Sequence, residues 1–366
     1  MAQMLQVFRR ICGSGAGRGK KDQTSKEESE MTDTSTTSPE RRVYQPIHPS
    51  VRPLLDREYV AFHDKYAQYV VPENMSGPWD GSLRTRYTWP YSGSPVVDVG
   101  SVKDIRPDPK FAIRVFTPAG TPPAAGWPVL IWLHGGGWIV GNIESDNDLC
   151  SLICRDTGCV VLNVDYRLAP EHQYPAAIED VSWTLRWINT AQAARDLSID
   201  HTKIMIGGAS SGANLAAVGA MLAADLNVPL VLSILVVPVT DNTATVETRW
   251  SAHKHSPWLT PVRMAWFRSL YLPDKSLETD WKVSPLFASK ERLGKSPKTW
   301  VAIAEQDLLS TEGRDYIKAL REAGVEVEVH SYPGMPHTMM ALSGVLHRGR
   351  QSIVDIVDAV RRAINS

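Results

Sequence analysis

The chain has 366 residues and a formal net charge of −1, because 39 Lys and Arg side chains nearly balance 40 Asp and Glu. This length is sufficient for one large α/β domain with a small cap. The near-neutral charge argues against a nucleic-acid partner, for which a basic stripe is expected. No run of about 20 apolar residues is present, so we expect no stable insertion into a membrane.

Residues 1–45 differ from the rest of the chain in composition. They are polar and rich in Gly, Ser and Thr, so they predict a disordered tail. Residues 1–21 carry several basic side chains, no acidic one and a short apolar helix face, a pattern similar to a mitochondrial transit peptide. We expect a cytoplasmic protein, and this basic segment leaves mitochondrial targeting open as an alternative.

Residues 46–95 are predicted to form the N-terminal part of a helical cap. Residues 51–66 have the apolar spacing of an amphipathic helix, and Ser50 precedes them as a candidate N-cap. The chain then enters the first part of the α/β core, which we place at residues 96–242.

A glycine-rich loop follows the first strongly apolar strand of this core. Residues 128–133 are apolar and lead into His134-Gly135-Gly136-Gly137-Trp138. Glycines let backbone N–H groups approach a bound carbonyl, so the loop predicts an oxyanion hole. A phosphate-binding loop is disfavoured because its Gly-Lys-Ser/Thr ending is absent. His134 is expected to support the loop.

The cysteines indicate neither disulfides nor a metal site. Cys150 and Cys154 are four residues apart on the helix expected after the glycine-rich loop, and Cys12 and Cys159 complete the set. Four cysteines in so long a chain form no disulfide framework, and a metal would need more ligands. We therefore expect buried apolar thiols, no metal and no organic cofactor.

The pentapeptide Gly208-Ala209-Ser210-Ser211-Gly212 has the pattern Gly-x-Ser-x-Gly between a strand at residues 201–207 and a helix that starts near Ala213. A serine on such a strand-to-helix turn exposes its hydroxyl above the sheet. Ser210 lies between two glycines on this turn, which makes it the expected nucleophile.

An acid and a histidine follow two later strands. Asp307 comes just after the apolar residues 299–304, and His337 comes after the alternating residues 325–330 and a Pro-Gly-Met-Pro loop. The ends of parallel strands share one edge of a sheet, and the order Ser, Asp, His is that of α/β-hydrolases. Asp241, after the preceding strand, remains a rival for the acid, and His330, His347 and His134 are the less favoured histidines.

Five motifs in this order resemble the hormone-sensitive-lipase family of carboxylesterases: His134–Trp138, Asp165–Glu171, Gly208–Gly212, Asp307–Leu309 and Gly334–His337. The resemblance spans residues 95–365. It implies an α/β-hydrolase fold, with a mostly parallel central sheet flanked by helices and a helical cap. It also implies hydrolysis of carboxylic esters with short or medium acyl chains.

Carried over by position, the resemblance implies catalytic roles for Ser210, Asp307 and His337. The oxyanion donors would be the backbone N–H groups of Gly136, Gly137 and Ser211. The chain departs from the family's usual Gly-Asp-Ser-Ala-Gly-Gly turn at Ala209, Ser211 and Ala213. Ser211 should be harmless, whereas Ala209 removes a side-chain acceptor beside the nucleophile.

A second cap segment is predicted at residues 243–283, after which residues 284–366 complete the core. The segment is rich in aromatic residues, including Trp258 and Trp266. Together with Trp138 beside the glycine-rich loop, we expect these two to line the substrate pocket, since ligand pockets are mainly apolar. Ordinary packing of the cap is the alternative.

These features predict a serine hydrolase that cleaves small-molecule carboxylic esters through an acyl-enzyme. An acyltransferase, an amidase or a lactonase would use the same triad. A non-catalytic ligand-binding receptor on this fold is disfavoured because the serine, acid and histidine are all present. The expected partner is an ester substrate, and a homodimer is compatible with the sequence.

Overall fold

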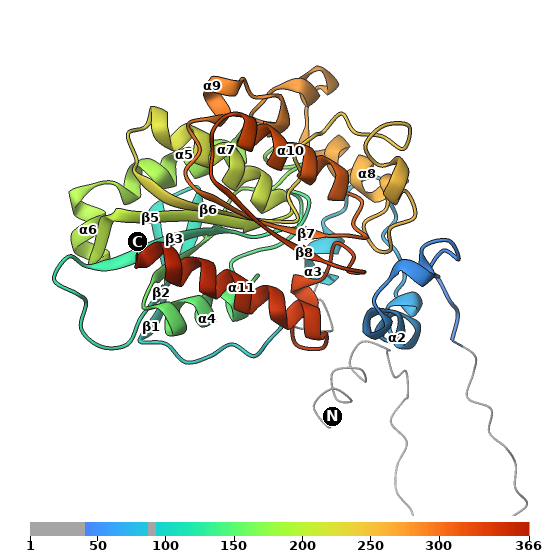
Figure 1. Ribbon diagram of the computed structural model, residues 1–366, viewed down its shortest axis with the longest axis horizontal. Helices are drawn as coiled ribbons and strands as arrows, with labels where there is room; N and C mark the ends of the chain where they lie inside the picture. Colours follow the sequence, from blue (N-terminus) through green and yellow to red (C-terminus); the bar gives the residue numbers. More distant parts are fainter. Residues whose placement is uncertain (1–40, 87–92, 366) are drawn as a thin grey trace, which may run out of the picture.

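The computed structural model describes residues 41–86 and 93–365. Of the disordered tail predicted at residues 1–45, residues 1–40, with the segment similar to a transit peptide, lie outside these residues. The end of the predicted tail is ordered, because the backbone N–H groups of Tyr44 and Gln45 donate to the Gln68 carbonyl oxygen at 2.8 and 3.0 Å. Within the described chain, eight strands form one sheet in the order β1-β2-β4-β3-β5-β6-β7-β8 (Figure 1). This arrangement confirms the predicted mostly parallel sheet.

The strands from β4 to β8 run parallel, whereas β2 is antiparallel to both of its neighbours. Parallel strands covered on both faces are apolar throughout their length, as in β3, where the side chains from Val129 to Leu133 are fully buried. The strands are β1 (Ser101–Asp108), β2 (Phe111–Thr117), β3 (Trp127–Leu133), β4 (Val160–Asp165), β5 (Ile199–Ala209), β6 (Leu230–Val236), β7 (Thr299–Ala304) and β8 (Val327–Tyr332).

Helices cover both faces of the sheet (Figure 1). One face packs against α4 (Asn147–Thr157) and α11 (His347–Ile364). The other packs against α5 (Ala176–Ile188), α7 (Ser211–Asp225) and α10 (Ser310–Glu322), with the short helices α6 (Ala191–Leu197) and α9 (Lys290–Leu293) nearby. Cys150 and Cys154 are buried on α4 as free thiols, as their spacing suggested.

Most of the remaining helical elements belong to the two segments predicted as the cap. Figure 1 shows α2, α3 and α8 on the same side of the molecule, although α8 is distant from the other two in sequence. The first segment holds η1 (Arg52–Leu54), α2 (Arg57–Lys65), η2 (Ala67–Tyr69) and α3 (Ser82–Arg86). The second holds η3 (Ser251–His253), α8 (Pro261–Tyr271) and η4 (Lys275–Thr279), followed by η5 (Pro285–Phe287); η6 (Met340–Leu342) precedes α11.

The helix expected at residues 51–66 is interrupted, and its N-cap is not Ser50. Leu55 has an extended backbone with φ −79° and ψ 150°, which separates η1 from α2. The Leu55 side chain is buried there. Asp56 caps α2 instead, because its carboxylate accepts the Glu58 N–H at 2.8 Å. Burial of Leu55 and a better cap at Asp56 together set this boundary.

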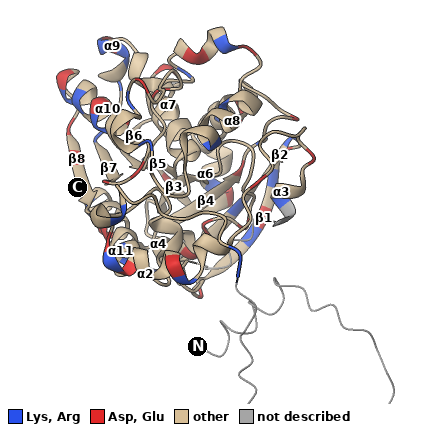
Figure 2. Ribbon diagram, turned by 90° about the vertical axis from the view of Figure 1, so that its right-hand side faces the viewer, with Lys and Arg blue, Asp and Glu red and all other residues tan. Residues whose placement is uncertain are grey.

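Charged side chains are mixed over the molecule. Figure 2 shows Lys and Arg interspersed with Asp and Glu, for example along α10 and α11. Among the described residues, no helix is long and apolar enough to cross a membrane. In the same part of the chain, no three His, Cys, Asp or Glu side chains are grouped so that they could hold a metal ion.

Candidate active site

The turn between β5 and α7 holds Ser210 in a rare backbone conformation. Its φ of 55° and ψ of −117° lie outside the common regions for a residue with a side chain. The flanking glycines permit the close packing of this turn. A Cβ on Gly212 would lie 2.0 Å from the Leu133 carbonyl oxygen, and one on Gly208 would lie 2.5 Å from the Gly212 backbone. Both glycines of the Gly-x-Ser-x-Gly pattern are therefore required, because a side chain at either position would clash with the neighbouring backbone.

Three side chains meet at this turn in a continuous chain of hydrogen bonds. The Ser210 Oγ lies 2.8 Å from Nε2 of His337, and Nδ1 of His337 lies 2.8 Å from Oδ2 of Asp307. Asp307 is buried, and its other oxygen accepts the Leu309 N–H at 3.2 Å. The structure thus brings together the three residues that the sequence suggested as nucleophile, base and acid.

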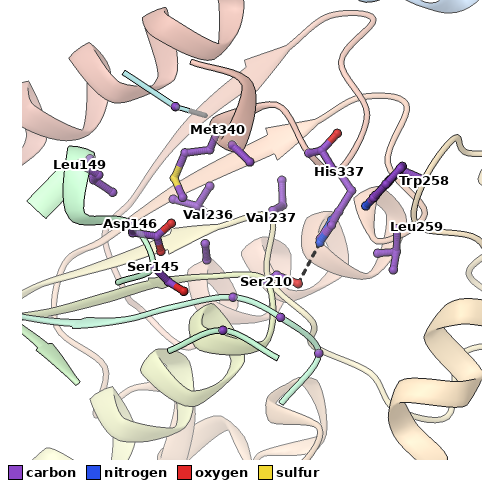
Figure 3. Close-up of a pocket in the computed structure, with 18 of the residues that line it drawn as sticks. Ser145, Asp146, Leu149, Ser210, Val236, Val237, Trp258, Leu259, His337 and Met340 are labelled. Carbon is purple, nitrogen blue, oxygen red and sulfur yellow. Dashed lines mark hydrogen bonds between the residues drawn. The ribbon is translucent and has the colours of Figure 1, made fainter. Parts of the chain in front are cut away.

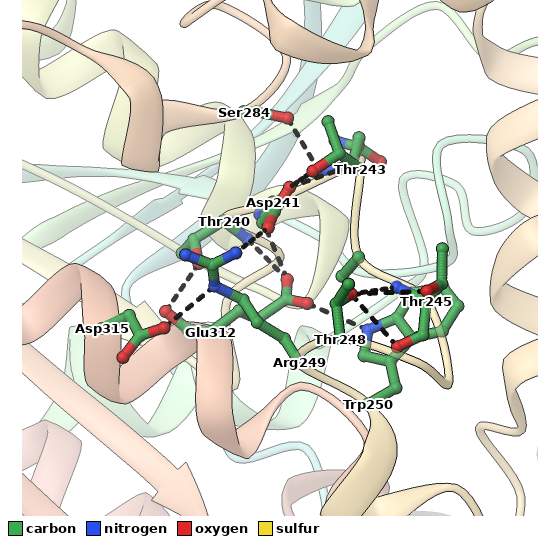
Figure 4. Close-up of polar contacts among 12 residues, drawn as sticks. Thr240, Asp241, Thr243, Thr245, Thr248, Arg249, Trp250, Ser284, Glu312 and Asp315 are labelled. Carbon is green, nitrogen blue, oxygen red and sulfur yellow. Dashed lines mark hydrogen bonds and ion pairs between the residues drawn. The ribbon is translucent and has the colours of Figure 1, made fainter.

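The rival acid Asp241 belongs to a different network, which Figure 4 draws. Asp241 is fully buried, and one of its oxygens lies 2.8 Å from Nη1 of Arg249. The other oxygen accepts the N–H and hydroxyl of Thr243 at 2.7 and 2.6 Å. These contacts hold the loop after β6, and none of them involves His337.

The other histidines also have partners away from Ser210. His330 Nε2 lies 2.9 Å from a Glu328 oxygen. His134 is fully buried, stacks on Tyr166 with ring centroids 4.4 Å apart, and has Nδ1 2.8 Å from the Gly135 carbonyl oxygen. Burial lowers the pKa of His134 to about 4, which keeps it neutral. It supports the glycine-rich loop, as expected.

The glycine-rich loop runs beside Ser210. A Cβ on Gly135 would lie 3.5 Å from the Ser210 Cβ. Gly136 and Gly137 have φ values of 126° and 59°, which only glycine adopts readily. Both glycines line the same cavity as Ser210. Ser211, the residue after Ser210, is the first residue of α7. Their backbone amides are candidates for an oxyanion hole.

Ser210 and His337 line a cavity of about 550 Å³, drawn in Figure 3. The volume is within the range of small-molecule sites. Its lining includes two groups of residues in addition to Ser210, His337 and the glycine-rich loop. We call the first the α8 arm: Trp258, Leu259, Arg263, Met264 and Phe267. We call the second the α4 arm: Ser145, Asp146, Leu149, Val236 and Met340.

Of the three tryptophans expected at the pocket, only Trp258 is among the described lining residues. Trp138 is fully buried and stacks on Tyr271 with ring centroids 4.3 Å apart. The backbone of Trp138 has a φ of 62°, and in this conformation its side chain lies in the core and not at the cavity. Trp266 packs toward Trp79, 6.0 Å away between ring centroids. The next residue on α8, Phe267, lines the cavity instead.

Most charged residues at the cavity have a partner of opposite sign. Arg263 pairs with Glu73 at 2.5 Å, and this pair joins the two segments that were predicted as the cap. Arg84 pairs with Glu171 at 2.6 Å, and Glu144 pairs with Arg114 at 2.8 Å. The two charges of each pair cancel, so these three pairs add no net charge to the cavity.

Asp146 and Asp148 are the exceptions, since no described basic side chain pairs with either. Burial raises the pKa of Asp146 to about 6, and burial also raises the pKa of Asp148. Sequence reasoning missed both. An acidic residue at the start of a helix has the pattern of an ordinary N-cap or first-turn acid, so the sequence carries no signal that the Asp146 carboxyl group lines a cavity.

Comparison with known proteins identifies the family. A family model described as an α/β-hydrolase fold matches residues 130–341. An AB hydrolase superfamily protein of Schizosaccharomyces pombe is 38% identical over 335 residues, which cover 87% of this chain and 96% of that protein. Ethyl acetate hydrolase of Pseudomonas putida is 32% identical, over 68% of this chain and 78% of the relative. A solved esterase of Pyrobaculum calidifontis superimposes with a TM-score of 0.74 at 26% identity, over 85% of this chain and 100% of its own. The chain therefore belongs to the α/β-hydrolase family, as its resemblance to the hormone-sensitive-lipase carboxylesterases predicted.

Proposed function

We propose that this carboxylesterase attacks its substrates with Ser210, uses His337 as the general base and orients that histidine with Asp307. Relatives named as esterases support hydrolysis of carboxylic esters. The observation that carries the proposal for the residues is the pair of 2.8 Å contacts that link Asp307, His337 and Ser210 at the cavity.

In the acylation step, His337 Nε2 takes the proton of the Ser210 hydroxyl while Oγ forms a bond to the ester carbonyl carbon. The carbonyl π electrons move to oxygen, and the backbone N–H groups of Gly136, Gly137 and Ser211 stabilise this oxyanion. Asp307 stabilises the charged imidazole. The carbon–alkoxy bond then breaks, and the alcohol leaves with the proton from His337.

Water completes the cycle. His337 removes a proton from a water molecule as the water oxygen attacks the acyl-enzyme carbonyl carbon. The bond between this carbon and the Ser210 Oγ breaks, and the serine recovers its proton from His337. The carboxylic acid is released, so the net reaction adds one water across the ester bond.

The cavity favours short to medium acyl chains. Its walls include Trp258, Phe267 and Leu149, and its volume is about 550 Å³. Each buried CH₂ adds about 0.8 kcal/mol while room remains, so kcat/KM should rise over the first few acyl carbons and then fall. Steady growth up to emulsified long-chain triglycerides would contradict this preference.

Replacement of the nucleophile tests the proposal. Ser210→Ala should lower kcat on a p-nitrophenyl ester by about 10³-fold or more, with a melting temperature close to that of the wild type. Ser211→Ala is the matched control, because alanine keeps the backbone N–H, which is the only group of Ser211 that is assigned a role. Near-wild-type activity of Ser210→Ala would refute the proposed nucleophile.

A further inference from the structure

The α4 arm contains a carboxyl group that the proposed reaction does not use. Asp146 lines the cavity together with Leu149, Val236 and Met340, and Figure 3 shows its carboxyl group on the same side of Ser210 as Leu149 and Met340. One of its oxygens accepts the Trp132 Nε1–H at 2.9 Å. Since Trp132 is fully buried on β3, this contact fixes the carboxyl group in place.

Asp146 does not serve as an ordinary helix cap. It stands at the N-cap position of α4, but its φ is 56° and its side chain makes no capping hydrogen bond. An N-cap residue normally has an extended backbone and binds an N–H of the first turn. In this left-handed conformation, the Asp146 side chain binds Trp132 and lines the cavity.

Among the aspartates and glutamates that line the cavity near α4, Asp146 has the fewest hydrogen-bond donors and cations around its carboxyl group. Glu144 has Arg114 at 2.8 Å and the Asn147 amide at 2.9 Å. The carboxyl group of Asp148 is stabilised by the backbone N–H groups of Leu149 and Ser94 and by the Ser343 hydroxyl. For Asp146, the described residues supply one N–H donor and no cation.

We infer that Asp146 selects esters that carry a positively charged amine on the end that enters the α4 arm. This inference rests on the proposed function of Ser210. A carboxylate in an apolar site is costly unless it is paired and hydrogen-bonded. An ammonium group supplies the positive charge that Asp146 lacks and a second N–H donor beside Trp132, and charge-assisted hydrogen bonds are roughly twice as strong as neutral ones.

The rest of the α4 arm suits the stem of such a substrate. Leu149, Val236 and Met340 are apolar and line the cavity around Asp146. They can contact the methylene groups between the ester and the amine. A hydroxyl at the same position would satisfy the hydrogen bond without the charge, so it should be recognised less well than an ammonium group.

Two matched pairs of esters test the inference, one for each side of the ester bond. In the first, ethyl 6-aminohexanoate is compared with ethyl heptanoate, in which a methyl group replaces the amine. In the second, 2-(dimethylamino)ethyl butyrate is compared with 3-methylbutyl butyrate. Ethyl 6-hydroxyhexanoate provides the neutral donor. Rates are measured near neutral pH, where the amines are protonated and most of Asp146 is ionised.

For the wild-type enzyme, we expect kcat/KM for the cationic ester to exceed that for its apolar partner by about tenfold or more in at least one pair. Asp146→Asn should reduce this ratio to near one. Asn retains an acceptor for Trp132 and tolerates a positive φ. Glu144→Gln is the matched control, and it should leave the ratio unchanged because Glu144 is already paired with Arg114.

The outcomes separate this inference from the proposed function. Loss of all ester hydrolysis in Ser210→Ala tests the nucleophile and does not depend on Asp146. If the wild type hydrolyses the apolar esters but shows no cationic preference in either pair, the role of Asp146 is refuted and that of Ser210 stands. A preference that survives in Asp146→Asn also refutes it. Should that variant fail to fold, the wild-type ratio still decides.

Discussion

At the scale of single residues, two buried acids at the ends of neighbouring strands have different neighbours. Asp307 contacts His337 at 2.8 Å, whereas Asp241 contacts Arg249 and Thr243. Asp307→Asn should lower kcat by about 10⁴-fold, the loss that follows when the acid of a serine-protease triad is replaced. Steady-state rates on a short p-nitrophenyl ester measure it.

Asp241→Asn is the control for this prediction. It removes the charge that pairs with Arg249, so it should lower the melting temperature while the folded enzyme keeps most of its kcat. If the two effects were reversed, with the larger loss of kcat in Asp241→Asn, the assignment of the acid would be wrong.

The tryptophans offer a second test at this scale. Trp258 lines the cavity, whereas Trp266 on the neighbouring helix does not. Trp258→Ala should enlarge the α8 arm and shift the optimum of kcat/KM to acyl chains that are longer by about two carbons, since each accommodated CH₂ adds binding energy. Trp266→Ala should leave the optimum in place. The same optimum in both variants and the wild type would show that Trp258 does not limit the chain.

At the scale of elements, Glu312 on α10 connects three segments. Its carboxyl group is fully buried and accepts the N–H groups of Thr240 and Asp241 at 2.9 and 3.2 Å and the Trp250 Nε1–H at 3.0 Å (Figure 4). Burial outweighs these donors and raises the pKa of Glu312 to about 8 from its usual 4.5. α10 thereby fixes the loop after β6 and the start of the second segment predicted as the cap.

This raised pKa makes the stability of the fold depend on pH. An acid that is harder to ionise in the folded state stabilises the fold fully below its unfolded pKa and loses that contribution as pH rises. The melting temperature should therefore fall between about pH 4.5 and about pH 8 through Glu312, and Glu312→Gln should flatten this fall. Asp315→Asn, which alters an exposed acid on the same helix, is the control. An unchanged pH profile in Glu312→Gln would exclude this origin.

The elements also show what local sequence patterns can predict. The strand at residues 299–304 and the serine turn lie where the apolar run and the Gly-x-Ser-x-Gly pattern placed them, because each signal depends on neighbouring residues. The position of Trp138 and the direction of Asp146 depend on positive φ angles in a loop. Those angles are set by packing against distant elements, so the sequence pattern could not predict them.

At the scale of the whole molecule, the cavity depends on segments that are far apart in the chain. Arg263 on α8 pairs with Glu73, and Arg84 on α3 donates to the carbonyl oxygens of Ile139 and Ala169 near the glycine-rich loop. The order of the motifs predicted the core, and an amphipathic pattern and an aromatic-rich segment predicted the two parts of the cap. The contacts between those segments, and hence the two arms of the cavity, appear only in the folded structure.

Covalent labelling tests whether Ser210 is the nucleophile of this carboxylesterase. The purified full-length enzyme is treated with a fluorophosphonate, its esterase activity is followed, and the modified residue is located by peptide mass spectrometry. We predict one label per chain, on Ser210, with loss of activity in proportion to labelling, and no label in Ser210→Ala or after prior incubation with excess ester substrate. Inactivation with the label on another residue, or full activity in an enzyme labelled stoichiometrically at Ser210, would contradict it.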